Sequence, residues 1–126
     1  MSQENAETVR VGLAAFMRGD LDRAFQMLAD EVRWEGIPGV EPCRSREEVQ
    51  NTIRSNYERG PLTEPDEVID AGDHVMVGFQ VTGEVFEPYR GRDRVYVVCS
   101  LREGKVWLMR DFLDRDEALE AAGVRE

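Results

Sequence analysis

The chain has 126 residues, a length that suits one domain with one core. Its 41% hydrophobic and 33% charged residues favour a folded protein over a disordered one. The 26 acidic and 16 basic residues leave a net charge of −10. Because this charge repels phosphate backbones and anionic lipids, we expect neither nucleic acid nor a membrane as a partner.

Other sequence signals exclude further classes. The N-terminal residues show no basic segment followed by an apolar run, and no apolar run reaches about 18 residues, so we expect a cytoplasmic protein. Cys43 and Cys99 are too few for a disulfide framework and have no metal-ligand spacing, so we expect two thiols and no metal site. Glycine motifs of nucleotide-binding loops and serine hydrolases do not occur, which leaves cofactors unsupported.

Two helices joined by a tight corner are predicted at the start of the chain. Helical spacing predicts the first over residues 4–18, with the inward side chains Val9, Leu13, Phe16 and Met17. Gly19 can end this helix in a left-handed conformation. Asp20 can then cap a second helix, whose inward stripe is Leu21, Ala24, Phe25 and Leu28.

A strand and a third helix follow. Residues 31–35 alternate in character and run into glycine and proline, which predicts a short strand. Ser45 and Glu48 have the spacing of a capping box, in which the glutamate reaches back to the amide of Ser45. The helix that starts there has the inward stripe Val49, Ile53 and Tyr57, and it ends at Gly60-Pro61.

The second half of the chain has the period of two that is typical of strands. Strand segments are predicted at residues 68–69, 75–86, 94–101 and 106–112, and Val75, Val77, Phe79 and Val81 share one face. Turns at Ala71-Gly72-Asp73 and Glu103-Gly104 join neighbouring strands. Asp114 and Glu117 then cap a short final helix before Gly123. This order predicts one α+β domain over residues 1–126.

Asp111 is the candidate reactive group. Because side chains alternate along a strand, we expect Trp107, Met109 and Asp111 to share one face of the last strand, so that two large apolar neighbours partly desolvate the acid. Desolvation raises the pKa of an aspartate toward the range useful for a general base. The alternative is an ionised aspartate bonded to backbone or a helix end. Trp34 and Tyr57 can line a pocket or simply fill the core.

Other polar residues have ordinary structural explanations. His74 follows a turn, where an exposed side chain is expected. Arg90, Arg92 and Arg94 can attract an anionic ligand, but such a run is more often a solvated loop. Gln80 and Ser100 can supply polar contacts from the sheet, although alternation alone does not decide which face looks into a cavity.

The pattern resembles the SnoaL-like family of the nuclear-transport-factor-2-like superfamily. The resemblance rests on Arg18-Gly19-Asp20-Leu21, Val32-Arg33-Trp34, Arg44 to Val49, and the block from Gly104 to Asp114 that leads into Glu117 to Gly123. It implies a curved antiparallel or mixed sheet wrapped around three N-terminal helices, a conical cavity, a short C-terminal helix and a homodimer formed through the sheet. Val106, Leu108 and Phe112, on the second face of the last strand, suit that dimer.

The resemblance also implies roles for single residues. Asp111 lies where cyclases and epoxide hydrolases of this kind place a catalytic aspartate. Gln80 and Thr82 stand where epoxide hydrolases use an arginine and a second aspartate, and Phe16 and Met17 stand where ketosteroid isomerases use a tyrosine. Two hypotheses therefore stay open. One is a cofactor-independent enzyme acting on a small apolar substrate, with Asp111 as base and a pocket formed by Trp34, Tyr57, Phe16, Met17, Gln80, Trp107 and Met109. The other is a non-catalytic ligand-binding or dimerisation module.

Overall fold

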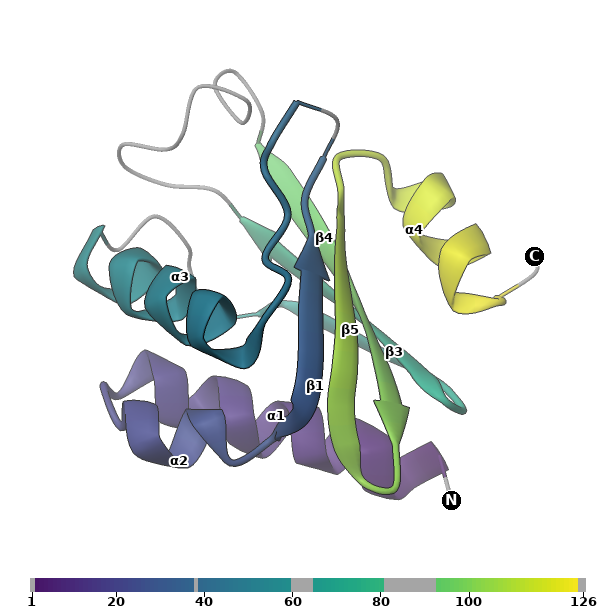
Figure 1. Cartoon of the computed structure of the whole chain (residues 1–126). Helices are drawn as coiled ribbons and strands as arrows, with labels where there is room; N and C mark the ends of the chain where they lie inside the picture. Colours follow the sequence, from purple (N-terminus) through teal and green to yellow (C-terminus); the bar gives the residue numbers. More distant parts are fainter. Residues whose placement is uncertain (1, 38, 60–64, 81–92, 125–126) are drawn as a thin grey trace.

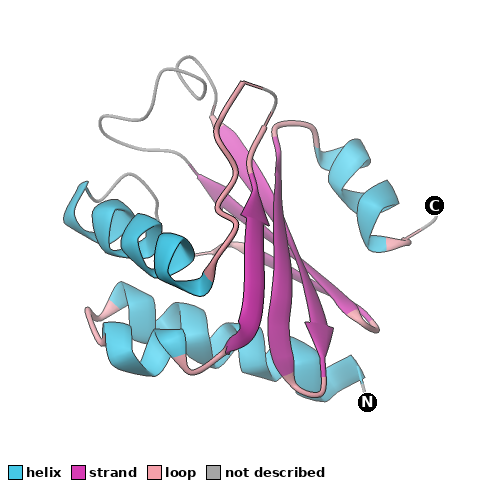
Figure 2. Ribbon diagram, in the orientation of Figure 1, coloured by secondary structure: helices cyan, strands magenta, loops and turns pink. Residues whose placement is uncertain are grey.

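A five-stranded sheet with helices on both faces forms the structure, a computed structural model that describes residues 2–37, 39–59, 65–80 and 93–124 (Figure 1). The elements in chain order are α1 (Ser2–Met17), α2 (Leu21–Phe25), β1 (Leu28–Glu35), α3 (Arg46–Arg59), β2 (Glu67–Ala71), β3 (His74–Gln80), β4 (Arg94–Arg102), β5 (Lys105–Phe112) and α4 (Arg115–Ala122). The predicted α+β class, the three N-terminal helices and the short final helix are confirmed (Figure 2).

The sheet is mixed. Its strand order is β1-β5-β4-β3-β2, in which β1 runs parallel to β5 and all other neighbours are antiparallel. Helices α1, α2 and α3 cover one face, here called the inner face, whereas α4 packs on the opposite, outer face (Figure 1). Each face therefore has its own apolar cluster.

The corner between α1 and α2 forms as predicted, but α2 is shorter. Gly19 has φ +83°, and a Cβ there would lie 2.5 Å from Oη of Tyr57, so both backbone conformation and space require glycine. Asp20 Oδ1 accepts a hydrogen bond of 3.2 Å from the Arg23 amide. The prediction that Leu28 continues this helix is wrong. Leu28 starts β1 and is paired with Val106 of β5, because strand pairing outweighs helical spacing here.

The entry of α3 also follows the prediction, with one difference. Ser45 Oγ accepts a 3.2 Å hydrogen bond from the Glu48 amide, but Glu48 Oε1 accepts from the amide of Arg44 at 2.7 Å and not from that of Ser45. At the C-terminal end of the chain, Asp114 caps α4 and Gly123 ends it at φ 84°. Side-chain capping rules therefore located three helix starts correctly.

A β-bulge in the β4–β5 hairpin reverses the alternation that the sequence predicts. Ser100 is paired with Leu108 and Leu101 with Val106, so Trp107 is the extra residue. Val106 thus joins Met109 in the inner cluster. The prediction that Trp107 shares a face with Met109 and Asp111 is wrong, since one inserted residue turns the first part of the strand over.

The bulge and α4 also change the predicted dimer face. Val106 points to the inner cluster, and Phe112 packs against the outer cluster to which α4 contributes Ala118, Leu119 and Ala122. Leu108 is 9% exposed. The three side chains therefore do not form one open apolar strip, and the homodimer stays a prediction without that support.

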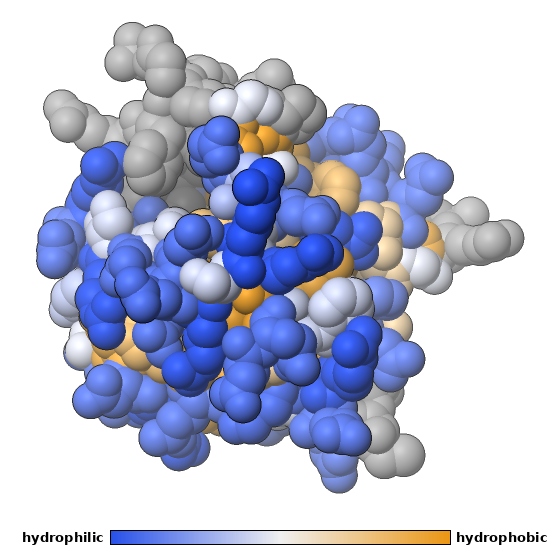
Figure 3. Space-filling view, in the orientation of Figure 1, coloured by the Kyte–Doolittle hydropathy of each residue, from blue (hydrophilic) through white to orange (hydrophobic). Residues whose placement is uncertain are grey.

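Some predictions lie outside the described residues: the end of the third helix at Gly60-Pro61, the strand continuation from Val81 to Phe86 with Thr82, and the arginines Arg90 and Arg92. On the face seen in Figure 3, hydrophilic residues dominate and apolar ones show in small patches between them. None of the described helices combines the length and the apolarity needed to cross a bilayer.

Candidate functional site

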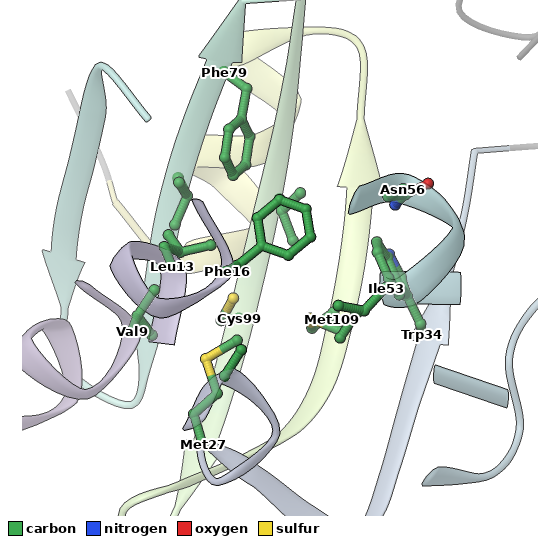
Figure 4. A pocket seen from close by; sticks show the side chains of 13 residues that line it. Val9, Leu13, Phe16, Met27, Trp34, Ile53, Asn56, Phe79, Cys99 and Met109 are labelled. Carbon is green, nitrogen blue, oxygen red and sulfur yellow. The ribbon is translucent and has the colours of Figure 1, made fainter. Parts of the chain in front are cut away.

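An apolar cavity of about 80 Å³ lies between the N-terminal helices and the inner face of the sheet (Figure 4). The helices contribute Val9, Leu13, Phe16, Ala24, Ile53 and Asn56. Strands β1, β3, β4 and β5, with the residue that precedes β1, contribute Met27, Trp34, Val77, Phe79, Val97, Cys99 and Met109. An engineered apolar cavity that binds benzene measures about 150 Å³, roughly twice this volume, so a ligand of one small ring requires the lining side chains to adjust.

Trp34 joins this cavity to Asp111. Its backbone exchanges hydrogen bonds of 2.9 and 2.8 Å with Cys43, and it is paired with Met109 in the parallel β1–β5 ladder, so the indole is fixed from both sides. Indole Nε1 donates a hydrogen bond of 2.8 Å to Asp111 Oδ1. The carboxylate is thus oriented by a neutral donor that has no acceptor capacity of its own.

The Asp111 carboxyl lies close to the cavity wall. Asp111 is half-buried and stands opposite Val97, a wall residue, in the β4–β5 ladder. Burial first, and the negative charge of Asp111 second, raise the pKa of the Cys99 thiol to about 12. Cys99 is another wall residue and remains protonated near neutral pH. Two residues of the cavity wall thus interact with the aspartate: Trp34 donates a hydrogen bond to it, and the thiol of Cys99 is affected by its charge.

A second hollow, of about 420 Å³, also meets Asp111. Glu35, Arg110 and Glu117 contribute charged groups to it, and Gly36, Ile37, Phe112 and Leu113 complete it. Asp111 therefore lines the wider, more polar hollow and is linked to the apolar cavity through the Trp34 indole and its ladder partner Val97.

The side chain that α3 presents to the cavity next to Ile53 is Asn56, not the predicted Tyr57. Asn56 follows Val49 by seven residues, which places it about 20° from Val49 around the helix axis. Tyr57 follows Val49 by eight residues and lies about 80° away. Tyr57 is 43% exposed and packs edge-on against Phe16, with ring centroids 5.8 Å apart. The spacing of α3 contained the signal for Asn56, but its polar side chain kept it off a list of apolar positions.

Comparison with known proteins gives the family. The SnoaL-like domain family matches residues 9–109. The chain belongs to the SnoaL-like family. Bal32a, from a soil-derived mobile gene cassette, is similar with 24% identity over 88% of this chain and 89% of that chain, at a TM-score of 0.69. No curated protein is a significant match.

Two further solved structures share the fold of this SnoaL-like domain. An LEH-like epoxide hydrolase of M. tuberculosis is 19% identical over 95% of this chain and 90% of that chain, with a TM-score of 0.66. A ketosteroid isomerase-like protein from Kribbella flavida DSM 17836 is 18% identical over 87% of this chain and 77% of that chain, with a TM-score of 0.69. At these identities the likeness establishes the fold, and the chemistry must be argued from the site.

The SnoaL-like domain brings four predicted site residues together and places four elsewhere. Phe16, Trp34 and Met109 line the cavity, and Asp111 bonds to Trp34. Away from this cavity lie Met17, Tyr57, Gln80 and Trp107. Met17 lines a separate hollow of about 440 Å³ between α1 and the segment around Val68. The guanidinium of Arg102 lies over the Trp107 ring, with Cζ of Arg102 4.2 Å from the ring centroid.

On the outer side, polar residues pair with one another. Gln80 Nε2 donates to Asp66 Oδ2 at 3.2 Å, and Arg94 donates to both Asp66 oxygens at 2.6 and 2.7 Å. His74, which we expected to be exposed, is half-buried, and its Nδ1 lies 2.8 Å from Ser100 Oγ. Arg94 is thus committed to an ion pair, which weakens the idea that it attracts an anionic ligand.

No metal site can be built from the part of the chain that the structure describes, because no group of three or more His, Cys, Asp or Glu converges there. The described wall of the cavity therefore offers apolar side chains, one amide and one protonated thiol, and the Trp34 indole links it to the neighbouring Asp111 carboxylate. Such a set can bind a small apolar molecule and can exchange a proton with it.

Proposed function

We propose that this SnoaL-like domain binds a small, largely apolar molecule of about one ring in the inner-face cavity, and that Asp111 acts on it as a general base. The observation that carries the proposal is the 2.8 Å hydrogen bond from Trp34 Nε1, in the cavity wall, to Asp111 Oδ1. It fixes a carboxylate beside an apolar hollow, which is the arrangement that proton abstraction requires.

The proposed step is a proton transfer. The Asp111 carboxylate takes a proton from a carbon next to a carbonyl, or from a water that attacks the substrate, and gives it back to the product at another atom. The indole of Trp34 holds the acceptor oxygen in place and does not compete for the proton. The apolar wall limits the access of water, which strengthens the interaction between the charged carboxylate and the substrate.

The relatives support the class of reaction by analogy. One structural neighbour is named as an LEH-like epoxide hydrolase and another as ketosteroid isomerase-like. Both names describe cofactor-independent chemistry in which a protein carboxylate can serve as base. The cavity of about 80 Å³ restricts the size of the substrate, since a multi-ring skeleton does not fit the space that the described residues leave.

The test uses deuterium uptake, which needs no knowledge of the natural substrate. Small cyclic ketones such as cyclopentanone and cyclohexenone are incubated with the protein in D₂O, and NMR follows loss of the protons next to the carbonyl. We expect exchange above the buffer rate, with a loss of about 10²- to 10⁴-fold in Asp111→Asn, since that is the usual contribution of a general base.

The control is Asp30→Asn, which makes the same chemical change at an exposed position of β1. It should exchange protons as fast as the wild type. Exchange that is equally fast in Asp111→Asn contradicts the role of Asp111 as base. Binding of the ketones without any catalysed exchange instead favours the second candidate, a binding module.

The second candidate is a non-catalytic binding module. It is supported by the cavity wall, in which the described side chains include no charged group. In that case the Trp34–Asp111 pair closes the cavity and orients its ligand. Ligand-dependent thermal stabilisation measures binding in both cases, because any ligand that prefers the native state raises stability.

A further inference from the structure

Asn56 is the polar group of the cavity wall that the site described above does not use. The wall carries two other groups able to form hydrogen bonds, the Trp34 indole and the Cys99 thiol. The indole N–H already donates to Asp111. The thiol, which burial keeps protonated, is a weak donor and a weak acceptor. The amide of Asn56 is thus the strongest hydrogen-bonding group of the described wall outside the Trp34–Asp111 pair.

The oxygen of this amide is enclosed. Asn56 Oδ1 is buried and has no hydrogen-bond partner among the described residues. Figure 4 shows Asn56 above Ile53 on α3, at the end of the cavity opposite Met27, with the amide nitrogen toward the other lining side chains and the oxygen away from them. Because the two ends of an amide are told apart only by their hydrogen bonds, either end can face the cavity. A buried acceptor without a donor destabilises the folded protein, so its place in an otherwise apolar wall needs an explanation.

A ligand provides that explanation. We propose that Asn56 is the polar anchor of the cavity and that the ligand is an apolar molecule of about one ring carrying a single hydroxyl group. This inference rests on the proposed function, because it requires the cavity to hold a ligand. It adds a specificity-determining residue and the chemical class of the ligand.

A hydroxyl fits the amide better than other polar groups. It can donate to Oδ1 and accept from Nδ2, so it can pair with whichever end of the amide faces the cavity. A charged ligand is excluded by the same wall, since no charged side chain among the described lining residues could compensate its desolvation. The hydroxyl head therefore lies at α3, and the apolar body lies against the sheet.

The cavity can adapt to a ring of six carbons. Two of its walls are the unbranched side chains Met27 and Met109, which change rotamer more easily than branched ones. A Cβ placed on Gly12 would lie 2.2 Å from Sδ of Met27, so the small residue on α1 gives this methionine its room. Phenol and toluene are suitable probes, because they have nearly the same shape and differ in the hydroxyl.

The experiment compares the affinities of phenol and toluene for four proteins by calorimetric titration. Wild type should prefer phenol. In Asn56→Leu, which keeps the branched shape of the side chain, phenol should bind about three- to tenfold more weakly, as expected for one hydrogen bond, and toluene should bind as well as before or better. Asp111→Asn should keep the preference for phenol. Asn51→Leu, an exposed change on the same helix, should match the wild type.

The midpoint of thermal unfolding without ligand gives a second readout. If Asn56 had only a structural role, Asn56→Leu would lower this midpoint. Asn56→Leu removes an unpaired buried oxygen, so its unfolding midpoint should rise by about 2 to 8 °C relative to wild type. Asn51→Leu carries the same gain in helix propensity at an exposed site, where it removes only the exposed 3.0 Å hydrogen bond from Arg54, and the rise in Asn56→Leu should exceed its change.

Each result decides between the proposals. Preference for phenol that is lost in Asn56→Leu, together with a higher midpoint, supports the anchor. Equal affinity for the two probes, a preference that Asn56→Leu leaves intact, or a preference lost in Asp111→Asn instead, overturns the anchor and leaves the binding cavity standing. If neither phenol nor toluene binds any of the four proteins, the proposed function fails and the anchor fails with it.

Discussion

The two faces of the sheet are built from similar residues but packed differently. The outer face is filled: Met76, Tyr96 and Val98 meet Ala118, Leu119 and Ala122 of α4. Ion pairs between α4, β2 and β4 border this cluster. The inner face meets larger helices and has more apolar residues, yet it retains a cavity whose wall includes the amide of Asn56 and the indole that bonds to Asp111. This difference predicts that the inner face tolerates added side-chain volume better than the outer face.

The largest expected effect lies on the filled face. Met76 is fully buried, and Met76→Ala removes its contacts with α4 and leaves a void, so it should lower the free energy of unfolding by about 2–5 kcal/mol. Chemical denaturation measures the change. Met17→Ala, on the half-buried side of α1, should lose clearly less. Equal losses for both methionines would mean that the outer face is not the better packed one.

Removal of the indole donor should have the next largest effect. Trp34→Phe keeps an aromatic ring but leaves Asp111 without the hydrogen bond from Nε1, so it should destabilise the protein by about 1–3 kcal/mol and slow proton exchange. Trp107→Phe changes the other tryptophan, which lies beside Arg102, and should be close to neutral in both measurements. The same denaturation and deuterium-uptake assays apply. A Trp107→Phe variant that is as strongly impaired as Trp34→Phe argues against the special role of Trp34.

One added methylene compares the two faces directly. Val98 is fully buried on the filled face, so Val98→Leu should cost about 1–3 kcal/mol through overpacking. Val77 is equally buried but lines the cavity, and Val77→Leu should be neutral or stabilising because the new carbon has space. The unfolding free energies of the two variants should therefore differ in this order. The reverse order contradicts the assignment of the cavity to the inner face.

The smallest effect concerns the ion pairs of the outer side. The Arg94 guanidinium is the main cause that lowers the pKa of Asp66 from 3.8 to about 2, and Arg115 is the main cause that lowers the pKa of Glu67. A depressed carboxyl pKa contributes stability above its ordinary value, and this contribution is lost as the pH falls toward the folded value.

Arg94→Gln tests that contribution. The wild-type unfolding midpoint should fall between about pH 4 and pH 2 as Asp66 is protonated, and the variant should fall less in this window because Asp66 has lost its strongest partner. Above pH 5 the variant should be only slightly less stable, since the two side chains are 31% and 36% exposed and water screens the pair. An unchanged pH profile would show that the pair does not stabilise the fold.

Most of the fold followed from local signals in the sequence. Asp20, Ser45 and Asp114 marked helix starts correctly, and the change of period after Glu67 located the meander. Residue spacing could not reveal the bulge at Trp107, because an inserted residue in a hairpin depends on the pairing register between two strands. The same limitation applied to Leu28, which is a strand residue because it pairs with Val106, a residue far away in the sequence.

The site was predicted in part for a related reason. Phe16, Trp34 and Met109 line the cavity and Asp111 bonds to Trp34. An interaction over 77 residues, such as this hydrogen bond, leaves no periodic trace in one sequence. Asn56 was missed although its place on α3 follows from helical geometry, because polar residues are assigned to the solvent side by default. A polar residue on the apolar stripe of a helix can therefore mark a residue that lines a cavity, as Asn56 does here.

The central claim is that the inner-face cavity admits a small molecule beside Trp34. The two tryptophans allow a direct measurement, because Trp34 lines the cavity and Trp107 lies outside it. In Trp107→Phe, titration with phenol under excitation at a wavelength that phenol does not absorb should give a saturable change in Trp34 emission. In Trp34→Phe, the emission of Trp107 should stay constant. Constant emission from Trp34, or the same change from both tryptophans, would contradict the account.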